Sequence, residues 1–358
     1  MCGALRVVDL GLRPWREMTA PRKHDGGWRG AMRSVTLGLV EPVEPMAREG
    51  RHLPGQFVLQ AFDKGAHRGG AGDHKFSHGH ALVLGGGVGR GGAARLAARG
   101  ALRVGAGLVS LACPRAAMAE NAARLDAVML RTLDGGDDLV AQLNDGRISA
   151  LCLGPGFGTS DREAALVAAA LSLHRKTVLD ADALTLLSQD AALFGGVHKD
   201  VVLTPHGGEF ARLFPDLAAK LAEPAIKGPA YSKVDAAREA AARSGCVVLY
   251  KGADTVIADP LGRCAVHAAQ YDRAAPWLAT AGSGDVLAGV ISGLMARGFP
   301  AFEAACMGAW LHTEAARAFG PGLIAEDLPE QVPVVLRRML GWGGQAATAG
   351  QPSSSPPA

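Results

Sequence analysis

The chain has 358 residues, of which 37 are basic and 34 acidic, so its formal net charge is only +3. So small a charge argues against a nucleic-acid partner, and aromatic residues at 5% are too few for platforms that stack single-stranded bases. Hydrophobic residues at 48% are typical of a globular protein with a large core and exclude disorder of the whole chain. Glycine stands out, because 48 of 358 residues is about 13%, against roughly 7% in an average protein.

Neither a membrane segment nor a disulfide framework is predicted. No apolar run of signal-peptide length precedes Arg13, and no later stretch approaches the roughly 18 apolar residues of a membrane span, so we expect a cytoplasmic protein with no membrane partner. Six cysteines lie at positions 2, 113, 152, 246, 264 and 306, with no CxxC pair and no histidine at zinc spacing. This spacing argues against disulfide bonds and structural metal. We also expect a homo-oligomer.

Three segments differ in composition. Residues 1–70 form an irregular extension in which prolines interrupt every candidate element except one short strand at Leu5–Leu10. Residues 71–340 alternate short apolar runs with alanine-rich helical runs, and residues 341–358 have the composition of a disordered tail. The middle segment is therefore the folded domain.

Within that domain the apolar runs predict strands in chain order. The predicted strands are His80–Leu84, Gly107–Ala112, Ala150–Leu153, Thr177–Leu179, Val201–Thr204, Cys246–Tyr250 and Thr255–Ala258. The predicted helices are Gly92–Arg103, Ala117–Ala123, Glu163–Leu173, Ala183–Leu187, Glu209–Phe214, Lys233–Ser244, a helix from Gly284 to Ala296, and Phe302–Arg317. Apolar strands alternating with helices predict an α/β fold, a mostly parallel central sheet with helices on both faces.

The first glycine cluster, residues 85–92, lies between a strand and a helix. Gly87, Gly89 and Gly92 formally satisfy GxGxxG. A dinucleotide fingerprint needs an acidic residue at the end of the next strand, but no acid precedes Glu120 there, so the match fails in its own context. A plain tight turn and a loop that approaches substrate both remain open.

Two further turns follow predicted strands, at the sheet edge where open α/β folds bind ligands. The first, Gly154–Thr159, is either a ligand loop or a structural turn. In the second, Thr204–Glu209, His206 is a ligand contact or a structural hydrogen-bonding residue. Glu209 either caps the helix or supports hydrated Mg²⁺.

The most informative stretch is ATAGSGDVLAG, residues 279–289, where small residues lead directly into an apolar helix. The free amides of Gly282, Ser283 and Gly284 would converge on one anion. Asp285 in the first turn is placed to accept a proton from an attacking hydroxyl, although simple capping is the alternative. Upstream, Lys251–Thr255 forms a turn suited to nucleotide phosphate or a plain β-hairpin turn.

Taken in order, seven blocks resemble the ADP-dependent NAD(P)H-hydrate dehydratases, the carboxyl-terminal half of bifunctional nicotinamide nucleotide repair proteins, whose fold is ribokinase-like. The blocks are GGGVGRGGAARLAARGALRVGAGLV, LGPGFG, VLDADAL, LTPHGGEF, VVLYKGADTVIADPLGR, LATAGSGDVLAGVISG and FEAACMGAWLH. Kinases of thiazole and pyrimidine alcohols share GSGD, but the LGPGFG, LTPHGGEF and KGADT stretches favour the dehydratase branch.

The resemblance implies an enzyme that returns (6S)-NAD(P)H hydrate to NAD(P)H, phosphorylating the C6 hydroxyl with ADP or ATP and eliminating phosphate. It implies that Asp285 is the general base and that Gly282, Ser283 and Gly284 form the oxyanion hole. It assigns the nucleotide to Lys251, Gly252, Ala253, Asp254, Thr255 and Gly284. It assigns the hydrate to Ala93, Gly156, His206 and Asp285, with Glu209 supporting Mg²⁺ through water.

Some features depart from the family pattern or leave alternatives open. An Asn-Pro-Thr-Gly-Asn-like stretch of the family is replaced by His267–Arg273, and Arg90 in the first glycine loop is interpreted as facing solvent rather than phosphate. Residues 5–12 resemble the end of an epimerase half, which would make epimerase activity the work of another polypeptide. A small-alcohol kinase and a non-catalytic dinucleotide-binding module are the competing functions.

Overall fold

The computed structural model describes residues 6–7, 16–17, 38–40, 74–226 and 229–340. The predicted tail at 341–358 and most of the predicted extension at 1–70, including the larger part of the epimerase-like stretch, lie outside the described residues. Three short strands are described in the extension, β1 (Arg6–Val7), β2 (Arg16–Glu17) and β3 (Gly38–Val40). β1 falls within the strand predicted at Leu5–Leu10.

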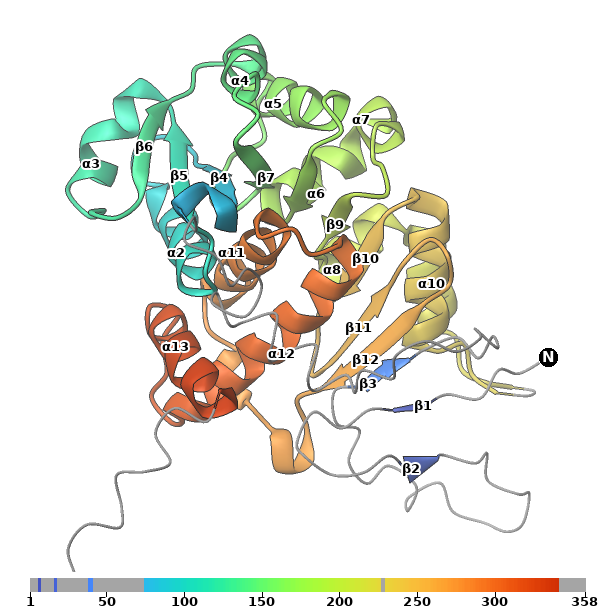
Figure 1. Ribbon diagram of the computed structural model, residues 1–358. Helices are drawn as coiled ribbons and strands as arrows, with labels where there is room; N and C mark the ends of the chain where they lie inside the picture. Colours follow the sequence, from blue (N-terminus) through green and yellow to red (C-terminus); the bar gives the residue numbers. More distant parts are fainter. Residues whose placement is uncertain (1–5, 8–15, 18–37, 41–73, 227–228, 341–358) are drawn as a thin grey trace, which may run out of the picture.

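A ten-stranded sheet runs through the domain in the order β3-β12-β11-β10-β9-β8-β7-β4-β5-β6 (Figure 1). Its strands after β3 are β4 (His80–Leu84), β5 (Leu108–Cys113), β6 (Met129–Thr132), β7 (Ile148–Leu153), β8 (Lys176–Leu179), β9 (Val201–Leu203), β10 (Val247–Tyr250), β11 (Asp254–Ala258) and β12 (Cys264–Ala268). The strands from β6 across to β10 are parallel, and β11, β12 and β3 continue the sheet antiparallel. The predicted mostly parallel sheet is confirmed.

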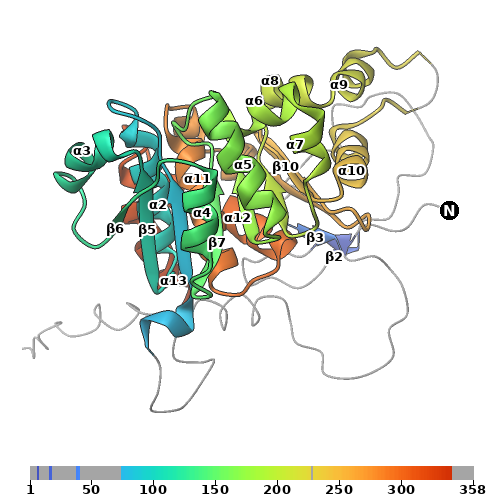
Figure 2. The same cartoon turned by 90° about the horizontal axis from the view of Figure 1, so that it is seen from above.

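Helices cover both faces of the sheet, so the domain has three layers (Figure 2). One face packs against α2 (Gly91–Arg103), α11 (Ser283–Ala296) and α12 (Ala301–Phe319), and α13 (Asp327–Met339) packs on α12 and α2. The other packs against α4 (Gly136–Leu143), α5 (Asp161–Ser172), α6 (Ala181–Gln189), α7 (Ala191–Gly195), α8 (Gly207–Leu213), α9 (Pro215–Ala222) and α10 (Lys233–Ser244). The short α3 (Met118–Ala122) lies beyond β5.

Strand β4 shows why the apolar runs become buried strands. Its alternate residues Ala81 and Val83 join the core under α2 and α11, while Leu82 and Leu84 join the core on the opposite face. Because successive strand side chains point to opposite faces, only a continuous apolar run suits a strand covered on both sides.

Part of the glycine excess serves helix packing. Helices α2 and α11 lie so close that a Cβ added at Gly289 would stand 2.0 Å from the Ala97 carbonyl oxygen, and one at Gly293 would stand 2.7 Å from that of Ala101. Such distances are far below van der Waals contact, so glycine is required at both positions. The close approach holds α11, whose first turn carries Asp285, directly against α2.

The sequence prediction missed β2, β3, β6, β12, α4, α7, α9 and α13, and β3 joins the domain sheet by pairing with β12 although residues 1–70 were predicted to be an irregular extension. Strands β6 and β12 each contain a polar residue, Arg131 and His267, so their sequences lack the fully apolar pattern of the central strands β9 and β10. Helix α13 contains Pro333, a residue that ordinarily ends a helix. No helix among the described residues is both long and apolar enough to cross a membrane.

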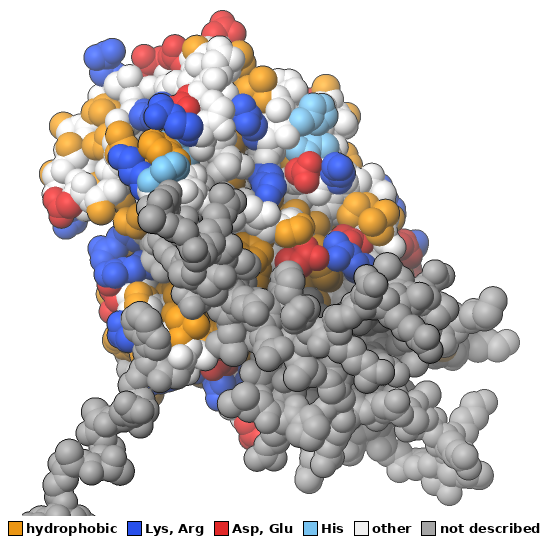
Figure 3. All heavy atoms as spheres, viewed as in Figure 1, with side chains coloured by type: hydrophobic (Ala, Val, Ile, Leu, Met, Phe, Trp, Pro, Cys, Tyr) orange, Lys and Arg blue, Asp and Glu red, His pale blue; other side chains and the backbone are white. Residues whose placement is uncertain are grey.

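On the face seen in Figure 3, basic side chains lie in separate groups with acidic ones between them, in keeping with the small net charge. The described cysteines, at positions 113, 152, 246, 264 and 306, are buried and unbridged.

Candidate active site

The candidate site lies at the carboxyl ends of the parallel strands. The turns after β7, β8, β9 and β10 meet there with the amino terminus of α11, as shown by contacts among Gly154, Asp180, Lys251 and Gly284. Ligands bind at this edge in open α/β sheets because loops and helix amino termini converge on it. The fold therefore gathers turns that are far apart in the sequence.

The amino terminus of α11 is held rigidly. Gly282 has a left-handed backbone with φ of 88°, and a Cβ there would stand 2.8 Å from Leu96 Cδ1. The Ser283 hydroxyl donates to the Leu278 carbonyl at 2.7 Å, and the buried His312 ring donates from Nε2 to the Ser283 carbonyl at 2.8 Å. Burial lowers the pKa of His312 to about 4, so the ring is a neutral donor. These contacts orient the first-turn amides, which have no partner within the helix.

Asp285 projects from this first turn into a charged environment. Its pKa is raised to about 7, first because burial disfavours the carboxylate and then because the carboxylates of Asp180, Asp182 and Glu209 repel it, whereas the Lys251 ammonium opposes the rise. A carboxyl group with a pKa near neutrality can accept a proton in one step and release it in another. The predicted catalytic residue thus has the proton affinity of a general base.

A buried ion pair lies beside the start of α11. Lys251 Nζ is 2.8 Å from Asp180 Oδ1 and 3.8 Å from Glu209 Oε2, and the Thr204 hydroxyl donates to the same Asp180 oxygen at 2.8 Å. A Cβ added at Gly284 would stand 3.4 Å from Lys251 Nζ. The ammonium is therefore next to the predicted oxyanion hole.

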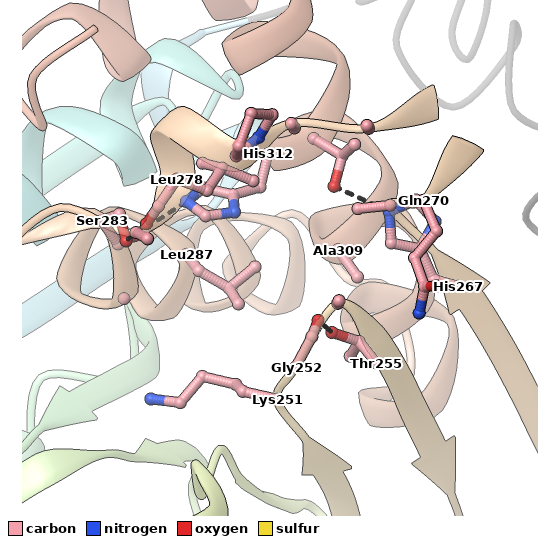
Figure 4. A pocket seen from close by; sticks show the side chains of 18 of the residues that line it. Lys251, Gly252, Thr255, His267, Gln270, Leu278, Ser283, Leu287, Ala309 and His312 are labelled. Atoms are coloured by element: carbon pink, nitrogen blue, oxygen red, sulfur yellow. Dashed lines mark hydrogen bonds between the residues drawn. The ribbon is translucent and has the colours of Figure 1, made fainter. Parts of the chain in front are cut away.

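The Lys251 side chain does not face the same way as the rest of its turn. Figure 4 shows it extending away from Gly252 and Thr255. Burial by itself would lower the pKa of Lys251, but the carboxylates of Asp180 and Glu209 outweigh that effect and raise it. Lys251 thus stays charged beside α11. Asp180 was not predicted as a site residue, although it lies in the VLDADAL block.

A cavity of about 710 Å³ opens between the β10–β11 turn and helices α11 and α12 (Figure 4). It is lined by Lys251, Gly252, Ala253, Thr255, His267, Ala269, Gln270, Tyr271, Ala274, Ala275, Pro276, Leu278, Ala279, Ser283, Gly284, Leu287, Ala309, His312 and Thr313. Most of these residues are apolar or small, which suits a flat base with phosphates at one end.

The cavity brings together most of the residues predicted for the nucleotide. Lys251, Gly252, Ala253, Thr255 and Gly284 all line it. Asp254 is not among the lining residues, because its carboxylate faces Lys233 at 3.3 Å. The turn is the β-hairpin turn between antiparallel β10 and β11, and its contact with nucleotide phosphate stays a prediction. The divergent segment His267–Arg273, which begins within β12, contributes His267, Gln270 and Tyr271 to the wall.

Two residues predicted for the hydrate lie side by side. Gly156 has φ of 59°, and a Cβ there would stand 3.2 Å from Ala93 Cβ and 2.6 Å from the Arg90 carbonyl oxygen. His206 instead caps α8, because its Nδ1 accepts from the Gly208 amide at 3.0 Å. Its outer ring is exposed. The structural role weighed for His206 is therefore observed, and its contact with the hydrate stays a prediction.

The glycine loop before α2 makes contacts with other segments of the protein. The Gly89 amide donates to Glu120 Oε2 at 2.8 Å, so this amide already has a protein carboxylate as its partner. A Cβ at Gly86 would stand 2.1 Å from the Gly156 carbonyl oxygen. The loop thus packs tightly against the turn after β7. Arg90 is exposed, as interpreted from the sequence.

Glu209 does not belong to a preformed metal cage. Its Oε2 accepts from the His206 amide at 2.8 Å, which completes the capping of α8. Among the described residues no group of three or more histidine, cysteine, aspartate or glutamate side chains is arranged to hold a metal ion. Capping is the role that the geometry shows, and the water-mediated Mg²⁺ contact remains a prediction.

The fold and this site define a ribokinase-like α/β protein with a nucleotide-sized cavity beside a helix amino terminus. A family model described as NAD(P)H-hydrate dehydratase matches residues 81–331. The chain belongs to this enzyme family, as the seven blocks predicted.

Curated relatives agree with the family match. The chain is 38% identical over 285 residues to the bifunctional NAD(P)H-hydrate repair enzyme of Moorella thermoacetica, covering 75% of this chain and 51% of the relative. It is 38% identical over 254 residues to the ADP-dependent (S)-NAD(P)H-hydrate dehydratase of Neisseria meningitidis, covering 68% of this chain and 78% of the relative. The chain thus spans about half the length of the bifunctional relative.

Solved structures show the same fold. The ADP/ATP-dependent NAD(P)H-hydrate dehydratase of Bacillus subtilis, co-crystallised with ATP and Mg²⁺, superimposes with a TM-score of 0.61 at 28% identity, covering 75% of this chain and 93% of that one. A ribokinase-like protein of Enterococcus faecalis gives a TM-score of 0.62 at 22% identity, covering 75% and 90%. The predicted ribokinase-like fold is confirmed.

Proposed function

We propose that this chain is an ADP-dependent dehydratase that restores NAD(P)H from (6S)-NAD(P)H hydrate, with ADP or ATP as phosphoryl donor. The observation that carries the proposal is the position of Asp285. Its carboxyl group, with a pKa of about 7, lies in the first turn of α11. The adjoining Ser283 and Gly284 line the nucleotide-sized cavity. Membership of the dehydratase family supplies the substrate class.

In the proposed reaction the Asp285 carboxylate accepts the proton of the C6 hydroxyl while the hydroxyl oxygen attacks the terminal phosphorus of ADP. The amides of Gly282, Ser283 and Gly284 stabilise the charge on the transferring phosphoryl group, and the Lys251 ammonium adds a positive charge beside them. AMP leaves. The ring nitrogen then expels the phosphate from C6, and loss of a proton from C5 forms the double bond, so the products are NAD(P)H, AMP and orthophosphate.

The proposal divides the site into two parts. Gly252, Ala253 and Thr255 belong to the nucleotide side, because they line the cavity. Asp254 would act through the backbone of this turn, since its carboxylate is engaged by Lys233. Ala93, Gly156 and His206 are assigned to the hydrate, together with Asp285.

Mg²⁺ is the cofactor proposed to accompany the nucleotide. Bound to phosphate oxygens, it would neutralise their charge. The described residues do not form a cage for it, because both Glu209 oxygens face His206 and one also faces Lys251. We therefore assign no step to a protein-bound metal. Glu209 remains the residue proposed to contact its hydration shell.

The test is one assay with two readouts. Hydrated NADH is incubated with ADP or ATP and the protein, and recovery of absorbance at the reduced-nicotinamide band is followed together with orthophosphate release. Equal amounts of NADH and orthophosphate are expected. A stable phosphorylated alcohol would identify a small-alcohol kinase instead. Binding of NAD(P) in calorimetry with no turnover of any hydrate would support a non-catalytic module.

The assay also bears on the partner. The dehydratase acts on the S form, so we propose that epimerase activity is supplied by another polypeptide. With a mixture of R and S hydrates, recovery should stop when the S form is consumed and resume when an epimerase is added. Complete recovery without an added epimerase would contradict this proposal. The homo-oligomer expected from the sequence also remains a prediction.

A further inference from the structure

Lys233, the first residue of α10, reaches the turn between β10 and β11, although α10 lies on the face of the sheet opposite to α11 and α12. Its Nζ donates to the carbonyl oxygens of Lys251 at 3.1 Å and Asp254 at 2.6 Å, and lies 3.3 Å from Asp254 Oδ1. The ammonium thus binds both ends of the turn at once. The Lys233 side chain is 18% exposed, so its hydrogen bonds face little competition from water.

The surroundings of Lys233 are built around its ammonium. Nζ lies 4.4 Å from the centre of the Tyr250 ring, a distance at which a cation is attracted to the ring face. A Cβ added at Gly252 would stand 2.5 Å from the same nitrogen, so glycine leaves the space that the ammonium fills. Burial lowers the pKa of Lys233, and the Asp254 carboxylate opposes the shift.

Other contacts hold the same turn from different sides. The Lys251 amide donates to the Pro205 carbonyl at 2.8 Å, and the Ala269 amide donates to the Ala253 carbonyl at 2.7 Å. With the two carbonyls bound by Lys233, oxygens of three turn residues point at protein donors. A carbonyl oxygen facing a phosphate would repel it, so turning these oxygens away favours an anion in the cavity.

We infer that Lys233 is a positioning residue that fixes the Lys251–Thr255 turn in the shape that receives the nucleotide phosphates, and so sets the affinity for ADP rather than the rate of the chemical step. This inference rests on the proposed function. Lys233 is not among the residues that line the cavity, so it acts through the backbone of the turn.

The test is Lys233→Met, which keeps most of the stem against Tyr250 and removes the ammonium. Loss of charge-assisted hydrogen bonds should raise the KM for ADP and its calorimetric Kd by roughly 10- to 100-fold. The KM for the hydrate and kcat should change less than about threefold. Lys233→Arg keeps the positive charge and should bind ADP more tightly than Lys233→Met. If Lys233 acted only by packing its side-chain stem, the two variants would not differ in this way.

Lys220→Met is the matched control. Lys220 also pairs with a carboxylate, Glu239 at 3.3 Å, and also lies over a tyrosine ring, Tyr231 at 5.7 Å, but its side chain is 50% exposed. No change in ADP affinity is expected. An unchanged ADP affinity in a folded Lys233→Met protein, or a fall in kcat with the KM for ADP unaltered, would overturn the inference.

Calorimetry with ADP separates this inference from the proposed function. If the wild type binds ADP but does not dehydrate the hydrate, the dehydratase proposal fails while the ADP comparison between the variants still decides the role of Lys233. If Lys233→Met does not fold, the comparison passes to Lys233→Gln, which keeps a hydrogen-bond donor but has no positive charge. That variant should bind ADP more weakly than the wild type, because the charge-assisted hydrogen bonds to the turn are lost. Equal affinity would contradict the inference.

Discussion

Helices α2 and α11 lie against each other on one face of the sheet, and each follows a glycine-rich turn. The position of the acidic residue at their amino termini differs. Before α2, the Gly89 amide is taken by the Glu120 carboxylate. At α11, the acidic residue is in the first turn itself, and the pKa of Asp285 is raised to about 7. The Gly89 amide thus already has a carboxylate partner, whereas a transferring phosphoryl group is the partner proposed for the amides of α11.

The same chemical change made at the two termini should separate them most clearly. Asp285→Asn removes the base and should lower turnover by roughly 10²- to 10⁴-fold with the fold intact. Glu120→Gln keeps a hydrogen-bond acceptor for Gly89 and should lower turnover less than about threefold. Steady-state dehydration with ADP, beside thermal unfolding of both variants, measures the contrast. Undiminished turnover in Asp285→Asn would refute the role of Asp285 as the base.

Neighbouring glycines of the α2 loop give the next largest contrast. A Cβ at Gly86 would stand 2.1 Å from the Gly156 carbonyl oxygen, whereas one at Gly87 would meet nothing within 4 Å. We expect Gly86→Ala to lower the free energy of unfolding by about 1–3 kcal/mol and Gly87→Ala to change it by no more than about 0.5 kcal/mol. Urea denaturation measures both. Equal stabilities would mean that the loop is not packed against the turn after β7.

The pH profile tests the charged environment at α11. Because Asp285 acts as a carboxylate, kcat/KM should fall about tenfold for each pH unit below its pKa, near 7. Asp180→Asn removes a negative charge that raises this pKa, so the acidic limb should move to lower pH by about one unit. If the acidic limb of the kcat/KM profile does not move in a folded Asp180→Asn protein, the assignment of that limb to Asp285 would be contradicted. Glu120→Gln is the control, since the Glu120 carboxylate does not contribute to the raised pKa of Asp285.

Local patterns predicted the central elements well. Strand β4 and helix α10 begin and end where the sequence placed them, because a continuous apolar run and an alanine-rich run ended by Gly245 each have one favourable local structure. Strands β6 and β12 and helix α13 were missed, since an internal polar residue in each strand and an internal proline in the helix weaken the same patterns. The seven ordered blocks identified the family, which a single glycine motif does not do.

The site was predicted in part. The grouping of Lys251, Gly252, Ala253, Thr255 and Gly284 around one cavity follows from their family resemblance and is what the structure shows. The partners of individual side chains were not predictable. The Lys251 ammonium pairs with Asp180, and the Asp254 carboxylate pairs with Lys233. These choices depend on charges brought from distant strands and helices.

The glycine excess that marks this sequence shows the same division. The positions at which glycines follow strands and precede helices can be read from the sequence, because they depend on neighbours along the chain. The contacts that require a glycine at each position depend on the folded molecule. Gly289 lets α11 approach α2, Gly86 lets two loops pack, Gly252 makes room for the Lys233 ammonium, and Gly284 borders the Lys251–Asp180 pair. The physical reason is that the space for a Cβ is set by atoms from other segments, which meet only when the sheet and its helices assemble.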